Sequence, residues 1–117
     1  MPPSPYIKSE LTGQVLAAQI LYEKVTEREC AGIQTDLQEA AKTTSWRITL
    51  DMSKVMMLAS AGLGMLINLH KHCTTGGGKL VIHGLSDELL DLMKLTKLNK
   101  LLTIADSKEA AMKKASA

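Results

Sequence analysis

The chain has few aromatic residues: its 117 residues include no phenylalanine, one tryptophan and two tyrosines. Apolar residues still make up 45% of the chain, so its core must be mainly aliphatic, with seven methionines available to fill it. Domains that bind single-stranded nucleic acid generally stack the bases on aromatic side chains. The shortage of aromatic residues therefore argues against a partner of that class.

The chain also lacks a strong excess of charge of either sign. Fourteen Lys and Arg residues against twelve Asp and Glu residues leave a formal net charge of only +2. Domains dedicated to the phosphate backbone of nucleic acids carry a larger basic excess, because each phosphate contact needs a cation. The charge balance therefore adds to the expectation that no nucleic acid is bound.

Long apolar runs, a signal peptide and a disulfide framework are absent from the sequence. No apolar run approaches the roughly 18 residues of a membrane span. Residues 1–5 contain all three prolines and lack the basic and apolar regions of a signal peptide. Cys30 and Cys73 are too few for a disulfide framework. We therefore expect a cytoplasmic protein with reduced thiols and no membrane insertion, built as one domain over residues 1–117 with a flexible tail at residues 1–5.

Strand-like and helix-like segments alternate along the chain. We expect strands at residues 6–11, 15–25, 46–52, 80–82 and 101–104, although residues 15–25 also have partial helical character. Helices are expected at residues 26–42, 60–75, from residue 86 onward, and at 108–115. Ser86 is expected to cap the third of these, because Asp87 and Glu88 follow it in the first turn. The order β-β-α-β-α-β-α-β-α indicates an α/β domain with a mixed, mostly parallel sheet flanked by helices.

Local signals predict how two of these segments begin. Thr26 and Glu29 form a capping-box signature, in which the threonine hydroxyl accepts a hydrogen bond from the third amide and the glutamate reaches back to the cap amide. In the strand over residues 46–52, apolar residues alternate with polar ones, which is typical of a half-buried strand. The first helix should bury one stripe of residues, namely Cys30, Ile33, Leu37, Ala40 and Ala41.

The helix over residues 60–75 has an apolar stripe that predicts its buried side: Leu63, Leu66, Ile67, His70 and Cys73. Met65 and Leu69 lie off this stripe. They form either an exposed binding patch beside Ser60 or part of a helix that is covered on two sides. The run Met56-Met57-Leu58 belongs either to the core or to a surface that contacts a partner. The second alternative is open because methionine side chains adapt to varied contacts.

Ser60 opens this helix after a loop, and two early glycines, Gly62 and Gly64, follow it. A serine at this place is either a helix cap or a regulatory site. Each glycine lowers the stability of the helix by about 1 kcal/mol relative to alanine. Glycine is useful there if another backbone or a bulky group must come close to the helix. A phosphate on Ser60 would lie at the positive end of the helix dipole, where the fold would tolerate it.

Other chemical signals in the sequence are weak. His70 and His72 are two residues apart on a helix and do not face each other, so a metal site with Cys73 is disfavoured. The glycine run before Lys79 follows a helix and lacks the Ser or Thr of a P-loop. We therefore expect no catalytic residue, no metal ligand and no cofactor.

The sequence resembles the STAS domain of bacterial anti-sigma factor antagonists. The matching signature is Asp51-x-Ser53 followed by Ser60-Ala61-Gly62-Leu63-Gly64. Further matches are Gly77-Gly78-Lys79-Leu80-Val81, Leu95-Thr96-Lys97-Leu98, and Asp106-Ser107 with Glu109-Ala110-Ala111. The resemblance spans about residues 15–111, and its fold agrees with the order of elements predicted above.

The resemblance implies regulation by partner switching. The unmodified protein would bind an anti-sigma factor that is also a serine kinase with a histidine-kinase-like ATPase fold, and binding would free the sigma factor. The kinase would phosphorylate Ser60 and so end the binding, and a serine phosphatase would reset the switch. The protein would then be a substrate and no enzyme, and any homodimer would be weak. The residues expected at the partner interface are Asp51, Ser53, Met56, Met57, Ala59, Ser60, Ala61, Gly62, Gly64 and Met65.

The sequence departs from the family pattern at three places. Ala59 stands where the family usually has aspartate, Lys97 stands where it usually has glycine, and an aromatic residue often found near Ala105 is absent. Because Ala59 offers no carboxylate, a second interpretation is a phosphorylation-independent STAS scaffold, either a stressosome component or the cytosolic subunit of a lipid-transporting ABC system. A small enzyme or nucleotide binder is a third, disfavoured because no catalytic constellation appears.

Overall fold

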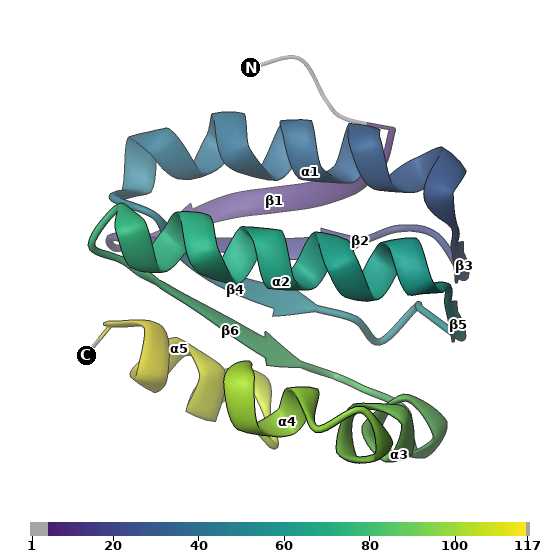
Figure 1. Cartoon of the computed structure of the whole chain (residues 1–117). Coiled ribbons are helices and arrows are strands. Elements are labelled where there is room, and N and C mark those ends of the chain that lie inside the picture. Colours follow the sequence, from purple (N-terminus) through teal and green to yellow (C-terminus); the bar gives the residue numbers. More distant parts are fainter. Residues whose placement is uncertain (1–4, 117) are drawn as a thin grey trace.

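The computed structural model describes residues 5–116, whose largest feature is a five-stranded sheet (Figure 1). Apart from Pro5, the predicted tail lies outside the described residues. Only the first strand runs antiparallel to its neighbour, and the other neighbouring strands are parallel. The predicted α/β class with a mixed, mostly parallel sheet is therefore confirmed. In sheet order the strands are β1 (Ile7–Thr12), β2 (Val15–Ile20), β4 (Arg47–Asp51), β6 (Lys79–His83) and β7 (Thr103–Ile104).

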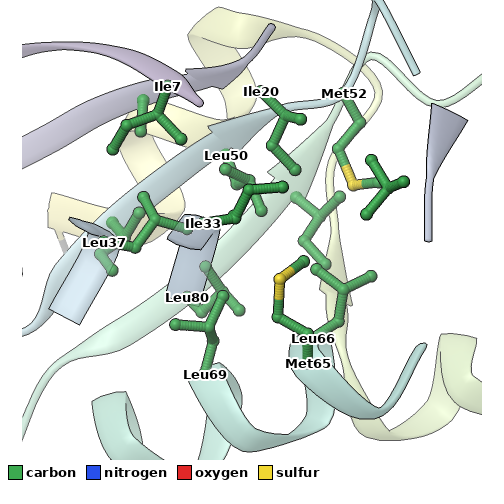
Figure 2. Close-up of a cluster of buried hydrophobic side chains, with 14 of the residues drawn as sticks. Ile7, Ile20, Ile33, Leu37, Leu50, Met52, Met65, Leu66, Leu69 and Leu80 are labelled. Atoms are coloured by element: carbon green, nitrogen blue, oxygen red, sulfur yellow. The ribbon is translucent and has the colours of Figure 1, made fainter. Parts of the chain in front are cut away.

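Helices cover both faces of the sheet. On one face, α1 (Glu27–Ala41) and α2 (Ser60–Thr75) lie side by side, and on the other α5 (Lys108–Ser116) packs against β4 and β6. The link from β6 to β7 contains α3 (Asp87–Leu95) and α4 (Leu98–Leu101), and a short 3-10 helix, η1 (Lys42–Thr44), follows α1. Side chains of the sheet, α1 and α2 form the aliphatic core shown in Figure 2.

The strand predicted over residues 15–25 is wrong in its second half. After β2 the chain leaves the main sheet and forms β3 (Lys24–Val25), which pairs in parallel with β5 (Met57–Leu58) in a separate two-stranded sheet. Because β3 leads into α1 and β5 leads into α2, this small sheet joins the starts of the two helices. The strand predicted over residues 101–104 is likewise shorter, since Leu101 is still helical.

Two predictions about how elements begin also need correction. Thr26 is the N-cap of α1, but its hydroxyl donates to the Glu29 carboxylate at 2.6 Å and accepts no amide hydrogen bond. β4 begins at Arg47 because Ser45 and Trp46 adopt left-handed backbone angles, with φ of 55° and 62°. Thr49 is buried together with its apolar neighbours, since helices cover β4 on both faces, so the predicted half-buried alternation is wrong.

The bounds predicted for α2 are confirmed, but its buried side is rotated from the predicted one. Met65 is 2% exposed and Leu69 is fully buried, and Figure 2 shows both directed into the core with Leu66. Leu63, Ile67 and His70 are only partly buried. The reason is that α2 packs against both α1 and β6, so residues between these neighbours are covered on two sides.

Candidate functional site

Ser60 is the first residue of α2, and its side chain is exposed. The N-cap is Ala59, which has extended backbone angles and a methyl side chain that cannot cap the helix. The interpretation of Ser60 as the N-cap is therefore wrong. The first turn of α2 contains no acidic side chain, whereas the first turn of α1 carries Glu27 and Glu29. The positive end of the α2 dipole thus has no carboxylate of its own helix beside Ser60.

Backbone hydrogen bonds hold the segment that leads to Ser60. The amides of Met56 and Met57 both donate to the Glu23 carbonyl, at 2.7 and 3.0 Å, and the amide of Ala59 donates to the Val25 carbonyl at 2.9 Å. Sequence reasoning missed the part played by Glu23 and Val25, because a backbone carbonyl leaves no signal in the residue type. These bonds fix where α2 begins and therefore where the Ser60 hydroxyl lies.

The two glycines of α2, Gly62 and Gly64, have different structural roles. A methyl group on Gly62 would overlap Leu58 Cδ1 and lie 2.9 Å from Leu58 Cγ, so only glycine allows β5 to pack this closely on the helix. A methyl group on Gly64 would meet no atom within 4 Å. Gly64 follows Ser60 by four residues and so lies on the same side of the helix. Gly62 therefore serves internal packing, while Gly64 leaves open space beside the serine.

Two methionines precede Ser60 on the surface. Met56 is 58% exposed and Met57 is 44% exposed, whereas Leu58 is buried. For Met56 and Met57 the core alternative is therefore wrong. The exposed patch predicted at Met65 is also wrong, because this side chain belongs to the core. We define the Ser60 surface as the exposed or partly exposed residues next to the start of α2: Met56, Met57, Ser60, Ala61 and Gly64.

Asp51 and Ser53 lie where β4 ends and the loop toward Ser60 begins. One carboxylate oxygen of Asp51 accepts from the Ser53 amide at 2.8 Å, and the other accepts from the Gln19 side-chain amide at 3.2 Å. Gln19 also donates to the Ser53 hydroxyl at 3.3 Å. Gly84, with φ of 77°, allows this close approach, since a methyl group there would be 2.6 Å from Asp51. Asp51 therefore shapes the start of the loop and is not part of the Ser60 surface.

Cys73 is buried and its neighbour His72 is exposed, and both lie near the end of α2, away from Ser60 at its start. Burial raises the pKa of the Cys73 thiol to about 12, so it stays protonated near neutral pH. His72 is exposed and stacks on Trp46, with ring centroids 6.0 Å apart. Within residues 5–116, no three His, Cys, Asp or Glu side chains gather as in a metal site. In the same part of the chain, no helix has the length and apolar character to cross a membrane.

The sheet order and helix positions define a class of α/β domain found in solved anti-sigma factor antagonists. An anti-sigma-factor antagonist (STAS) domain protein from Planctomyces limnophilus has 16% identity and a TM-score of 0.83 over 95% of this chain and 98% of that one. An antagonist from Mycobacterium paratuberculosis has 14% identity and a TM-score of 0.82, covering 95% and 93%. The Bacillus cell fate determinant SpoIIAA, in its phosphorylated form, has 14% identity and a TM-score of 0.69, covering 92% and 97%.

At these identities the likeness is one of fold. A family model for the STAS domain matches residues 5–111, which is most of the chain. The chain therefore belongs to the STAS domain family, as its Asp51-x-Ser53 and Ser60–Gly64 motifs predicted.

Proposed function

We propose that the whole chain acts as one cytoplasmic domain and is an anti-sigma factor antagonist that works by partner switching. In the unmodified state it binds an anti-sigma factor that is also a serine kinase. Phosphorylation of Ser60 ends the binding, and a serine phosphatase restores it. The protein is a substrate in this cycle and no enzyme. The observation that carries the proposal is the exposed Ser60 hydroxyl at the first position of α2, held by backbone bonds beside exposed Met56 and Met57.

The energetics favour a switch at the interface over a switch in the fold. A phosphate adds about −1.5 to −2 charges at neutral pH. At the start of α2 it would gain roughly 0.3–2 kcal/mol from the helix dipole. Buried in an interface without a cationic partner, it would cost several kcal/mol, and about 4 kcal/mol is a thousandfold in affinity. Phosphorylation is therefore expected to release the partner while the domain stays folded.

The surface around Ser60 suits a partner that comes close. Met56 and Met57 offer adaptable apolar contacts, and the absence of a side chain at Gly64 lets a partner backbone approach the helix beside the serine. A Gly64→Leu variant should therefore weaken partner binding.

The test uses the purified chain, ATP and any serine kinase encoded beside its gene. Mass spectrometry should show a gain of about 80 Da on Ser60, and Ser60→Ala should abolish it while Ser53→Ala, the matched control, retains it. Ser60→Asp should bind the kinase at least about a hundredfold more weakly than Ser60→Ala. Modification at another residue, or equal binding by Ser60→Asp and Ser60→Ala, would contradict the proposal.

A second candidate is a phosphorylation-independent scaffold, in a stressosome or as the cytosolic subunit of a lipid-transporting ABC system. The observation that favours it is Ala59, which places a methyl group at the N-cap where a carboxylate would otherwise contact the helix start or a kinase. Co-purification with an ABC ATPase, or a large self-assembly on size exclusion, retained by Ser60→Ala and Ser60→Asp alike, would support the scaffold over the switch.

A further inference from the structure

A row of polar side chains crosses four strands of the main sheet. Strand pairing places Lys8 opposite Gln19, Gln19 opposite Asp51, and Asp51 opposite His83, so the four residues are direct neighbours from β1 to β6. Because side chains alternate along a strand, they lie on the face that α5 covers, together with Val15 and Val81 of the α5 core cluster. We call these four residues the polar row.

A cavity of about 220 Å³ opens over the polar row. It lies beside the start of α5, since Lys108 contributes to its lining, and the remaining walls are Ser9, Glu10, Ala17, Ala18 and Thr49. α5 packs against β4 and β6, which leaves the β1 and β2 side of this face less covered. The cavity is at the carboxyl end of β4 and β6, the end at which parallel sheets usually bind ligands.

The charges that line the cavity balance. Lys8 and Lys108 supply two cations, and Glu10 and Asp51 supply two anions. His83 is only 5% exposed, and its imidazole makes no hydrogen bond within residues 5–116. Burial lowers the pKa of His83, and nearby Lys108 lowers it further while Asp51 opposes the shift. At neutral pH the ring is therefore uncharged, with one nitrogen that donates and one that accepts.

We propose that this cavity binds a small zwitterion of amino-acid size. Its anionic group pairs with Lys8 and Lys108, its cationic group pairs with Asp51 and Glu10, and His83 supplies a hydrogen bond. The volume of about 220 Å³ lies below the roughly 300–1,000 Å³ of pockets that enclose drug-sized ligands, so a ligand of amino-acid size suits the cavity better than a nucleotide. The balanced lining likewise favours a neutral ligand with both charges over a polyanion. The proposal does not depend on phosphorylation of Ser60.

The test is a titration of the ¹⁵N-labelled full chain with the common α-amino acids at millimolar concentration and neutral pH. At least one should shift the amide resonances of the polar row saturably. For that amino acid, the matching amine without the carboxylate and the matching acid without the amine should bind about tenfold more weakly. Lys8→Gln and Lys108→Gln should each weaken binding by a similar factor. Lys54→Gln, which removes an exposed lysine outside the cavity, should not.

Three outcomes would overturn the proposal. In the first, no amino acid shifts the polar row. In the second, the shifts are unchanged in Lys8→Gln and Lys108→Gln. In the third, ATP or inorganic phosphate shifts these resonances and no amino acid does. Because the three lysine side chains are exposed, these variants are expected to fold, and their amide spectra in the absence of ligand verify this directly.

Discussion

The two glycines at the start of α2 allow the packing around Ser60 to be tested by a matched pair of variants. Gly62→Ala and Gly64→Ala make the same chemical change two residues apart in one helix. Each replaces glycine by the best helix former, a gain of about 1 kcal/mol. At Gly64 the new methyl group meets no atom within 4 Å, so the full gain should appear.

At Gly62 the methyl group overlaps the Leu58 side chain. Leu58 is itself buried in the core, so it cannot move aside freely. Overpacking of this kind costs about 1–3 kcal/mol, which equals or exceeds the gain in helix propensity. Gly62→Ala is therefore expected to be neutral or destabilised by up to about 2 kcal/mol, and the difference between the two variants is the packing cost alone.

Urea unfolding followed by Trp46 fluorescence measures both variants. With a denaturant slope of about 1–3 kcal/mol/M, Gly64→Ala should raise the midpoint by roughly 0.3–1 M. Gly62→Ala should leave it unchanged or lower it. An equal rise in both variants would refute the close packing of β5 on α2 and, with it, our account of how Ser60 is positioned.

Three further predictions follow from the described side chains. Met65→Ala should lower the free energy of unfolding by about 2–5 kcal/mol, whereas Met56→Ala should change it by less than about 0.5 kcal/mol; similar values in urea unfolding would contradict the difference in their burial. Lys97→Gly should stabilise the chain by up to about 1 kcal/mol in the same assay, because Lys97 has φ of 61°. Since burial lowers the pKa of His83, the unfolded state takes up its proton first, near pH 6.5. Stability should therefore fall as the pH drops below about 6.5, until folded His83 is also protonated. His83→Gln should flatten this dependence of stability on pH. An unchanged pH profile in this variant would show that His83 does not cause it.

The sequence predicted the main elements because their signals are local. Residue type and the spacing of apolar residues were enough to predict three features: the alternation of strands and helices, the cap at Ser86 and the bounds of α2. The Ser86 hydroxyl, for example, accepts from the Leu89 amide at 3.2 Å, as its position before two acidic residues predicted. The stripe of α1 is buried as expected, since all five of its predicted residues are buried.

Features that depend on contacts distant in sequence could not be predicted. The periodicity of α2 pointed to Leu63 and Ile67, since nothing in the helix itself reveals that both α1 and β6 cover it. The short β3 and β5 are held by pairing with each other, and neither segment alone reveals its partner. The polar row appears only after the strand register is known, because its members come from four separate strands.

The pairing of β3 with β5 has a consequence for how this protein can diversify. The bonds that place Ser60 run from the carbonyls of Glu23 and Val25 to backbone amides, so they survive a change of side chain at Met56 or Met57. The side chains that this segment exposes and the position of the Ser60 hydroxyl are thus set by different atoms of one short segment. The exposed side chains can therefore change while the backbone keeps the Ser60 hydroxyl in the same place.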